Sequence, residues 1–287
     1  MLRSCCKELL RVLGVIVLLI TGTSFAGAEE KIKLEELIAR HLNSIGTAEA
    51  RTAAKSRSMQ GEASASFQVG GLGELHGQGG IVSEGHKTCI RMNFAHPEYP
   101  GEHIAFDGKN VTVGILKPGI RSSLSKYFYE QNTTIKEGLL GGAITTNWFL
   151  NNIGSENLKL NYKGLKKVDG KELHMLECKI KGENLLKIDL YFEPDSFRHV
   201  MSKHELRQPP QLAYTYRSDP NVERDTVYTI TERFDNFQQV DGLTLPHTYK
   251  ITISIDSANR TSVVEYIIKG SNMVHNVPVD PGVFKVQ

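Results

Sequence analysis

The chain has 287 residues, of which 40% are hydrophobic and 23% are charged, and its formal net charge is +2. This composition is typical of a soluble, folded protein with one large or two small domains. A protein that binds nucleic acid normally carries a marked positive excess, because it must displace the counterions of the phosphates. The charge therefore disfavours nucleic acid as a partner.

Residues 1–28 have the features of a secretory leader. Three basic residues precede an apolar run at 12–20, and residues 26–28 are small, as a signal peptidase requires. The competing interpretation is an uncleaved anchor, but the run is far shorter than the ~20 apolar residues that span a bilayer. The sequence thus predicts a signal peptide followed by one folded domain at 29–287. Removal of the leader takes away three basic residues and one acidic residue, which leaves the mature chain with equal numbers of both signs.

Two of the four cysteines, Cys5 and Cys6, lie in the leader, and the mature chain keeps Cys89 and Cys178. These two could pair in an oxidising compartment. However, a disulfide needs Cα atoms within ~7 Å and converging side chains. The alternation of apolar and polar residues places Cys89 with polar neighbours and Cys178 with apolar ones. The pattern favours opposite faces of a sheet, and whether the two are oxidised stays open.

The mature chain begins with a helical pattern. Between residues 31 and 45, apolar residues and His41 recur at steps of three and four, and Gly46 follows. Thr47 is a suitable N-cap for a second, short helix at 48–56. We expect both helices to cover one face or one end of the structure that follows.

Most of the remaining chain alternates between apolar and polar residues with a period of two, which indicates half-buried strands. Asp107 and Gly108 suit a hairpin turn. Ten or eleven antiparallel strands are too many for a flat sheet, so the sheet must curl. The predicted fold class is α+β, with a highly curved antiparallel sheet. The strand-like segments are 62–69, 74–84, 87–94, 103–115, 158–163, 172–180, 185–192, 198–206, 227–234, 249–255 and 262–270.

The stretch from 120 to 152, which we call the plug, interrupts the strand pattern and reads as short amphipathic helices joined by glycines. In one interpretation it is a connection that closes the core. In the other it is a mobile lid over a ligand cavity. Because glycine gives the backbone freedom that alanine would restrict, Gly138, Gly141 and Gly142 are candidate hinges of such a lid.

A curved sheet with helices over its concave side can enclose an apolar ligand pocket. For each candidate wall residue, ordinary core packing is the alternative, because cavity walls and cores have the same composition. The apolar residues on the inferred inward faces are Phe67, Ile90, Met92, Phe94, Phe106, Leu124, Phe128, Leu139, Leu140, Trp148 and Phe149.

Signatures of catalysis or metal binding are missing from the sequence. It contains no HExxH, CxxC, Walker or GxSxG motif. His199 and His204 are five residues apart, so on a regular strand they would face opposite ways and could not share a metal ion. We therefore expect a binding protein without catalytic residues, metal or cofactor. A hydrolase is the third class of function considered, and it would need a nucleophile that the sequence does not reveal.

Several phrases together resemble the outer-membrane lipoprotein-sorting proteins, the LolA/LolB-like group of secreted Gram-negative proteins. They are LIARHLNSIGTAEA, FAHPEYPGEHIAFDGKNVTVGILKPG, EGLLGGAITTNWFL, LKKVDGKELH, LYFEPDSFRHV and VDGLTLPHTYK.

The resemblance implies an unclosed β-barrel with helices as a lid over a cavity that accepts acyl chains. It further implies a periplasmic carrier or chaperone for lipid or lipoprotein acyl chains. From the order of strands and helices we expect the folded domain to be a monomer. The alternative is a periplasmic sensor or regulatory module of the same fold that binds an envelope protein.

Overall fold

The computed structural model describes residues 32–68, 72–210, 224–258 and 260–286. The predicted leader lies outside these ranges. Residues 32–287 form one compact unit. Among the described helices, none combines the length and apolar character needed to cross a membrane.

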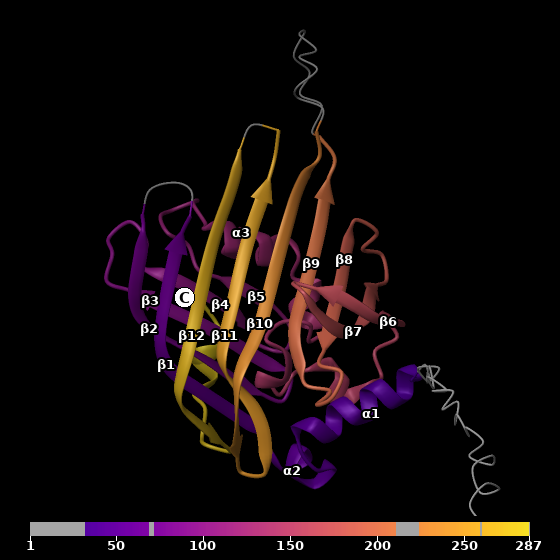
Figure 1. The fold of residues 1–287 in the computed structure, drawn as a ribbon. Coiled ribbons are helices and arrows are strands. Elements are labelled where there is room, and N and C mark those ends of the chain that lie inside the picture. Colours follow the sequence, from indigo (N-terminus) through magenta and orange to yellow (C-terminus); the bar gives the residue numbers. More distant parts are fainter. Residues whose placement is uncertain (1–31, 69–71, 211–223, 259, 287) are drawn as a thin grey trace, which may run out of the picture. The chain divides into compact units, whose positions relative to one another are not determined.

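The described strands form a single antiparallel sheet of twelve strands (Figure 1). The fold class agrees with the prediction, although the strand count exceeds the expected ten or eleven. The bounds are β1 Ser56–Phe67, β2 Glu74–Glu84, β3 Lys87–Phe94, β4 Gly101–Phe106, β5 Val111–Val113, β6 Leu158–Val168, β7 Lys171–Ile180, β8 Leu186–Phe192, β9 His199–Gln208, β10 Thr226–Val240, β11 Leu243–Asp256 and β12 Thr261–His275.

The order of the strands explains why the chain needs the plug. From β1 in the middle of the sheet, the chain adds β2 to β5 in sequence toward one edge. It then starts again at the opposite edge with β6 and returns, strand by strand, until β12 pairs with the other side of β1. The sheet stays open, with β5 and β6 at its two ends. The plug is the connection that crosses from one edge to the other.

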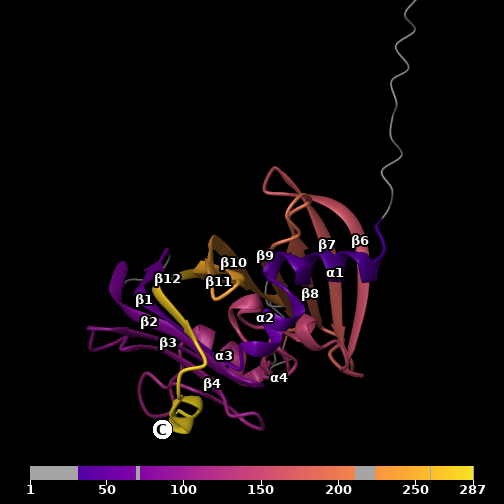
Figure 2. The same ribbon diagram turned by 90° about the horizontal axis from the view of Figure 1, so that it is seen from below.

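A wide antiparallel sheet twists and coils, which gives it a concave side. Viewed from below, strands β1–β4 and strands β6–β9 lie on either side of helices α2 (Ala48–Ala53), α3 (Ser123–Glu130) and α4 (Thr133–Lys136) (Figure 2). The concave side is thus occupied by helices, as the sequence predicts.

The N-terminal helices follow the sequence prediction closely. Helix α1 spans Leu34–Ile45 and buries Leu37, Ile38, His41 and Ile45. It ends at Gly46 and packs against β11 and the plug. The Thr47 side chain accepts a hydrogen bond from the Ala50 amide and caps α2.

The plug is less helical than its spacing suggests. After α3 and α4 come two short 3-10 turns, η1 (Gly142–Ile144) and η2 (Phe149–Asn152). Helix α4 ends at Lys136, so Leu139 and Leu140 lie in irregular backbone. They are buried nevertheless. These two leucines are apolar because they pack against the sheet, and they do not form one face of a helix.

The two cysteines of the described chain are free and buried in different clusters. Cys178 belongs to the main core on the concave side. Cys89 packs with Ala105 and Phe284 under the C-terminal turn η3 (Pro281–Phe284). The prediction that they point to opposite faces is confirmed.

Candidate functional site

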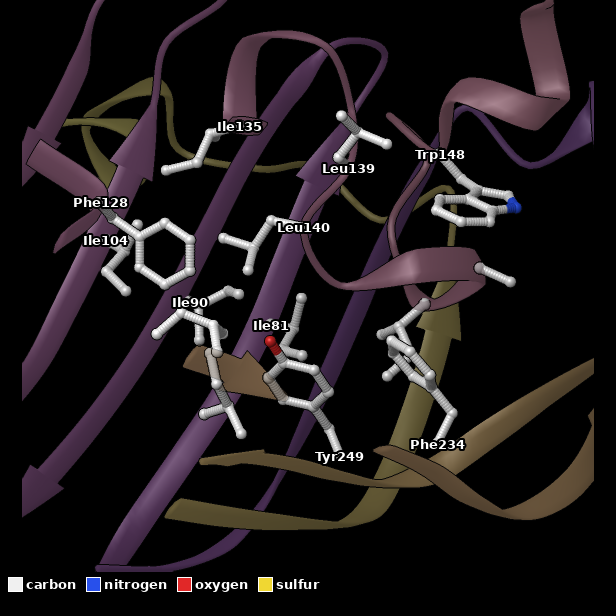
Figure 3. Close-up of a cluster of buried hydrophobic side chains, with 14 of the residues drawn as sticks. Ile81, Ile90, Ile104, Phe128, Ile135, Leu139, Leu140, Trp148, Phe234 and Tyr249 are labelled. Carbon is white, nitrogen blue, oxygen red and sulfur yellow. The ribbon is translucent and has the colours of Figure 1, made fainter. Parts of the chain in front are cut away.

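Ten of the eleven predicted wall residues are buried in one core cluster, and Phe67 is the exception because it is half-buried. Side chains of the plug, including Phe128, Leu140 and Trp148, face residues of the sheet such as Ile90 and Phe234 (Figure 3). The chain therefore brings these ten residues together as a packed interior. Each makes the contacts that a core residue makes.

A buried tryptophan ties the plug to α1. Trp148 Nε1 donates to His41 Nε2 over 3.0 Å, and its ring stacks on His199 with centroids 4.7 Å apart. His41 Nδ1 lies 3.0 Å from the carbonyl oxygen of Phe197. Burial lowers the pKa of His41 to about 4, so the ring is neutral at neutral pH. A neutral ring with its proton on Nδ1 satisfies both contacts.

A second tie joins the plug to the middle of the sheet. Glu232 on β10 is buried, and its Oε1 accepts from the Gly141 amide over 2.7 Å and from the Tyr249 hydroxyl over 2.8 Å. Its Oε2 lies 3.5 Å from Nε2 of His204, which is equally buried. At the other side of the turn, Arg57 Nη1 donates to the carbonyl oxygen of Ile144. Polar groups thus fix the backbone of the plug at both ends of η1.

The position of His204 corrects the sequence analysis. His199 and His204 were expected on opposite faces, but both point to the concave side and are buried. The register between β8 and β9 shifts at Phe192, which pairs with His199, whereas Tyr191 pairs with Met201. This bulge adds one residue and reverses the alternation. Among the described residues no group of three or more potential ligands could hold a metal ion.

The three candidate hinge glycines have the left-handed backbone that favours glycine, with φ of 69°, 78° and 50° for Gly138, Gly141 and Gly142. A Cβ on Gly138 would lie 2.0 Å from the Asn147 carbonyl oxygen. One on Gly142 would lie 2.8 Å from His199 Nδ1. Turn geometry and close packing account for glycine at these positions, and motion about them stays a proposal.

Phe67 lines a cleft that the sequence analysis did not predict. Its volume is about 730 Å³, and it lies where the ends of β1 and β12 meet the segment before α3. That segment is folded back by a turn in which the Ile120 amide donates to the Lys117 carbonyl oxygen, with Gly119 at φ 78°. The residues that line the cleft are Phe67, Leu72, Glu98, Tyr99, Leu116, Lys117, Ile120, Arg121, Ser122, Ser123, Arg260, Ser262, Val264 and Tyr266.

Buried hydrogen bonds hold the floor of the cleft. The Tyr99 hydroxyl donates to Glu102 and lies 2.6 Å from the Tyr266 hydroxyl. The other carboxyl oxygen of Glu102 accepts from Ser125 over 2.6 Å, which connects the sheet to the first turn of α3. Burial raises the pKa of Glu102 above its usual range. These hydrogen bonds hold the rings of Tyr99 and Tyr266, both of which line the cleft.

Sequence reasoning could not find this cleft because its walls come from four stretches that are far apart in the chain. The one local signal was the turn Lys117-Pro118-Gly119-Ile120, in which proline and glycine occupy the central positions of a tight turn. That turn leaves Ile120 on the surface with 54% of its side chain exposed. An exposed isoleucine beside basic residues was recognisable only once the fold was known.

The comparisons with known proteins concern the fold. No family model matches the sequence, and no curated protein does. A LolA superfamily protein from Nitrosomonas europaea is 14% identical, with 89% of this chain and 98% of that chain covered and a TM-score of 0.40. An outer membrane lipoprotein-sorting protein domain from Vibrio parahaemolyticus is 11% identical, with 86% and 95% covered and a TM-score of 0.40.

A DUF1329 family protein from Desulfovibrio piger is 9% identical, with 88% and 96% covered and a TM-score of 0.36. The expected resemblance to lipoprotein-sorting proteins is thus found among solved structures.

Proposed function

We propose that this protein is a periplasmic, noncatalytic binding protein that takes the acyl part of a lipid or lipoprotein, and that the acyl chain enters through the cleft at Phe67. The observation that carries the proposal is the continuity between the cleft and the core. Phe67, Leu72 and Leu116 line the cleft and also pack against the main hydrophobic cluster. An acyl chain in the cleft would therefore contact apolar side chains that border the core.

The size and lining of the cleft fit this role. Its volume of about 730 Å³ lies within the ~300–1,000 Å³ of typical small-ligand sites. Burial of apolar surface provides the driving force, about 0.8 kcal/mol for each methylene removed from water. Six of the ten packed wall residues belong to the plug and four belong to strands β3 and β4. Deeper entry would require the plug to move away from those four. In this proposal Gly138, Gly141 and Gly142 allow that motion, and the predicted monomer needs no second chain.

The test places a charge on the cleft wall without touching the core. Ile120→Asp changes an exposed wall residue, so we expect an intact fold and at least tenfold weaker binding of a palmitoyl lipid, from loss of apolar contact and desolvation of the carboxylate. The matched control is Ile153→Asp, which changes another isoleucine that is 54% exposed and does not line the cleft. Displacement of a fluorescent fatty acid measures both affinities.

Native mass spectrometry of the purified full chain separates the proposal from its rival. Co-purified lipid, lost in Ile120→Asp and kept in Ile153→Asp, supports an acyl-binding protein. The regulatory alternative predicts an empty cleft and a stoichiometric complex with an envelope protein. Equal lipid affinity in wild type and Ile120→Asp would contradict entry through the cleft.

A further inference from the structure

The cleft has an uneven charge distribution. Three of its lining residues are basic, Lys117, Arg121 and Arg260, and one is acidic, Glu98. None of the three basic side chains forms an ion pair within the described part of the chain. Other surface arginines do have carboxylate partners: Arg224 pairs with Asp256 at 2.8 Å. The basic side chains of the cleft thus retain their capacity to bind an anion.

Arg121 is held in position for such a contact. Its guanidinium carbon lies 4.1 Å from the centre of the Tyr129 ring, a cation–π arrangement that fixes the plane of the group. Its Nε is buried and donates to no acceptor of the described residues. The contacts within the described chain therefore leave the hydrogen-bonding capacity of the guanidinium group unsatisfied, and hydrogen bonds from such a charged group to an anion are the strong ones.

The first turn of α3 adds to the positive potential. Ser122 and Ser123 line the cleft, and Ser122 is the N-cap, whose side chain accepts from the Ser125 amide. The amino-terminal end of a helix carries a partial positive charge that favours anions. It lies beside Arg121, so both act on the same part of the cleft.

Apolar side chains line the same cleft as these basic groups. Phe67, Leu72, Leu116 and Val264 complete the wall. A ligand that satisfies both parts has an anionic head and an apolar chain. Two planar guanidinium groups and one ammonium group offer more donors than the two oxygens of a carboxylate accept, whereas a phosphate group presents three oxygens.

We propose that the cleft binds a monoacyl lipid with a phosphate headgroup, the phosphate on Arg121, Arg260 and Lys117 and the acyl chain along the wall at Phe67. This inference rests on the proposed acyl-binding function and names the ligand class for the same cleft.

The test compares two probes with the same chain, 1-palmitoyl lysophosphatidic acid and monopalmitoylglycerol, by calorimetry with the full protein below the concentration at which either lipid aggregates. We expect the phosphate lipid to bind about tenfold more tightly or better, since charge-assisted contacts are stronger than neutral ones. Arg121→Gln/Arg260→Gln should abolish that difference by weakening the binding of the phosphate lipid. Lys166→Gln/Lys167→Gln, which removes two charges from exposed positions on β6, should change neither affinity.

Each other outcome has a definite meaning. Equal binding of both lipids to wild type overturns the headgroup assignment but leaves the proposed function standing. Failure of both lipids to bind contradicts both proposals. Inorganic phosphate that binds as tightly as the lysophosphatidic acid overturns the lipid assignment. If the double variant unfolds, Lys117→Gln, at an exposed turn, provides the same comparison with an expected loss of about threefold.

Discussion

The indole Nε1 of Trp148 donates to Nε2 of His41 over 3.0 Å, in the buried layer between the plug and α1. An indole N–H can only donate, so Nε2 must accept, and the proton of the neutral ring is on Nδ1, where it is donated to the Phe197 carbonyl oxygen. A protonated His41 has no lone pair for Trp148. The contact that locks the plug is therefore sensitive to pH.

The first prediction concerns acid stability. Burial, the largest cause, lowers the pKa of His41 to about 4, whereas the unfolded chain keeps the usual 6.5. Between these values the unfolded state binds more protons, so stability falls as pH decreases from about 6.5 to 4. We expect a loss from His41 of about 2 kcal/mol between pH 7 and pH 5. Burial also lowers the pKa of His199, which adds a loss of the same sign.

Urea unfolding at both pH values measures this loss. His41→Gln removes the titration while offering an acceptor and a donor, so its stability should depend less on pH. His76→Gln, at an exposed histidine, is the control and should behave as wild type. A pH dependence that is identical in His41→Gln and wild type would contradict the assignment.

The second prediction concerns the glycines of the plug, in pairs matched for backbone conformation. Gly142→Ala (φ 50°) introduces a Cβ 2.9 Å from Phe234, whereas Gly85→Ala (φ 57°) meets nothing within 4 Å. Both cost about 1 kcal/mol for the left-handed backbone, and overpacking adds roughly 1–3 kcal/mol to Gly142→Ala alone. The denaturation midpoints of the two variants test this. Equal midpoints would show that the plug relaxes freely around Gly142.

A further pair addresses the proposed gate. Gly141 and Gly164 have nearly the same backbone conformation, with φ of 78° and 77°, but Gly141 is buried in the plug whereas Gly164 lies on β6. If the plug swings to admit a ligand, Gly141→Ala should slow ligand entry and exit more than Gly164→Ala under conditions in which both variants are folded. Stopped-flow emission of Trp148, the sole tryptophan, follows both rates. If the rates in Gly141→Ala are unchanged, or if Trp148 emission does not change when lipid is added, the plug is part of the core and does not act as a gate.

The third prediction concerns Glu232, which holds the Gly141 amide. Glu232→Leu leaves that N–H and the Tyr249 hydroxyl without their acceptor, and we expect a loss of about 2–4 kcal/mol. Glu62→Leu, at an exposed site on β1, should change stability by less than about 0.5 kcal/mol. Combination with Tyr249→Phe should cost less than the sum of the single losses, because the two groups share one bond. Additive losses would refute the contact.

The fourth prediction concerns the cysteines. Both are buried and free, and burial raises the pKa of Cys89 to about 12, so thiolate is scarce at neutral pH. An alkylating reagent should therefore leave Cys89 and Cys178 unmodified in the native protein and label both in denaturant, as read by intact mass. A reductant should not alter the melting temperature. A melting temperature that falls on reduction would reveal a disulfide instead.

Much of the architecture is local and was readable from the sequence. The cap at Thr47 and the apolar spacing around Leu37 follow from helix geometry, so α1 and α2 were predicted close to their observed bounds. The opposite faces of Cys89 and Cys178 follow from the two-residue period of strands. The interruption of that period marked the plug.

The sequence predictions that were wrong concern residues whose positions depend on distant partners. The bulge opposite Phe192 turns His204 toward Glu232, and an inserted residue leaves no mark in the hydrophobic pattern. Leu139 and Leu140 are buried by the sheet although their backbone is not helical. Tertiary packing overrode local propensity at both places.

The cleft is wholly a product of the tertiary structure. Phe67, Tyr99, Arg121 and Arg260 are separated by tens of residues, and only the pairing of β1 with β12 and the crossing of the plug bring them together. In the sequence each residue has an ordinary local interpretation: a strand aromatic, a loop tyrosine, two surface arginines. The sequence by itself determined a curved sheet around a plug, because hydrophobic period and turn chemistry are local. The tertiary structure decided where that assembly stays open, because an opening depends on which distant side chains pack against each other.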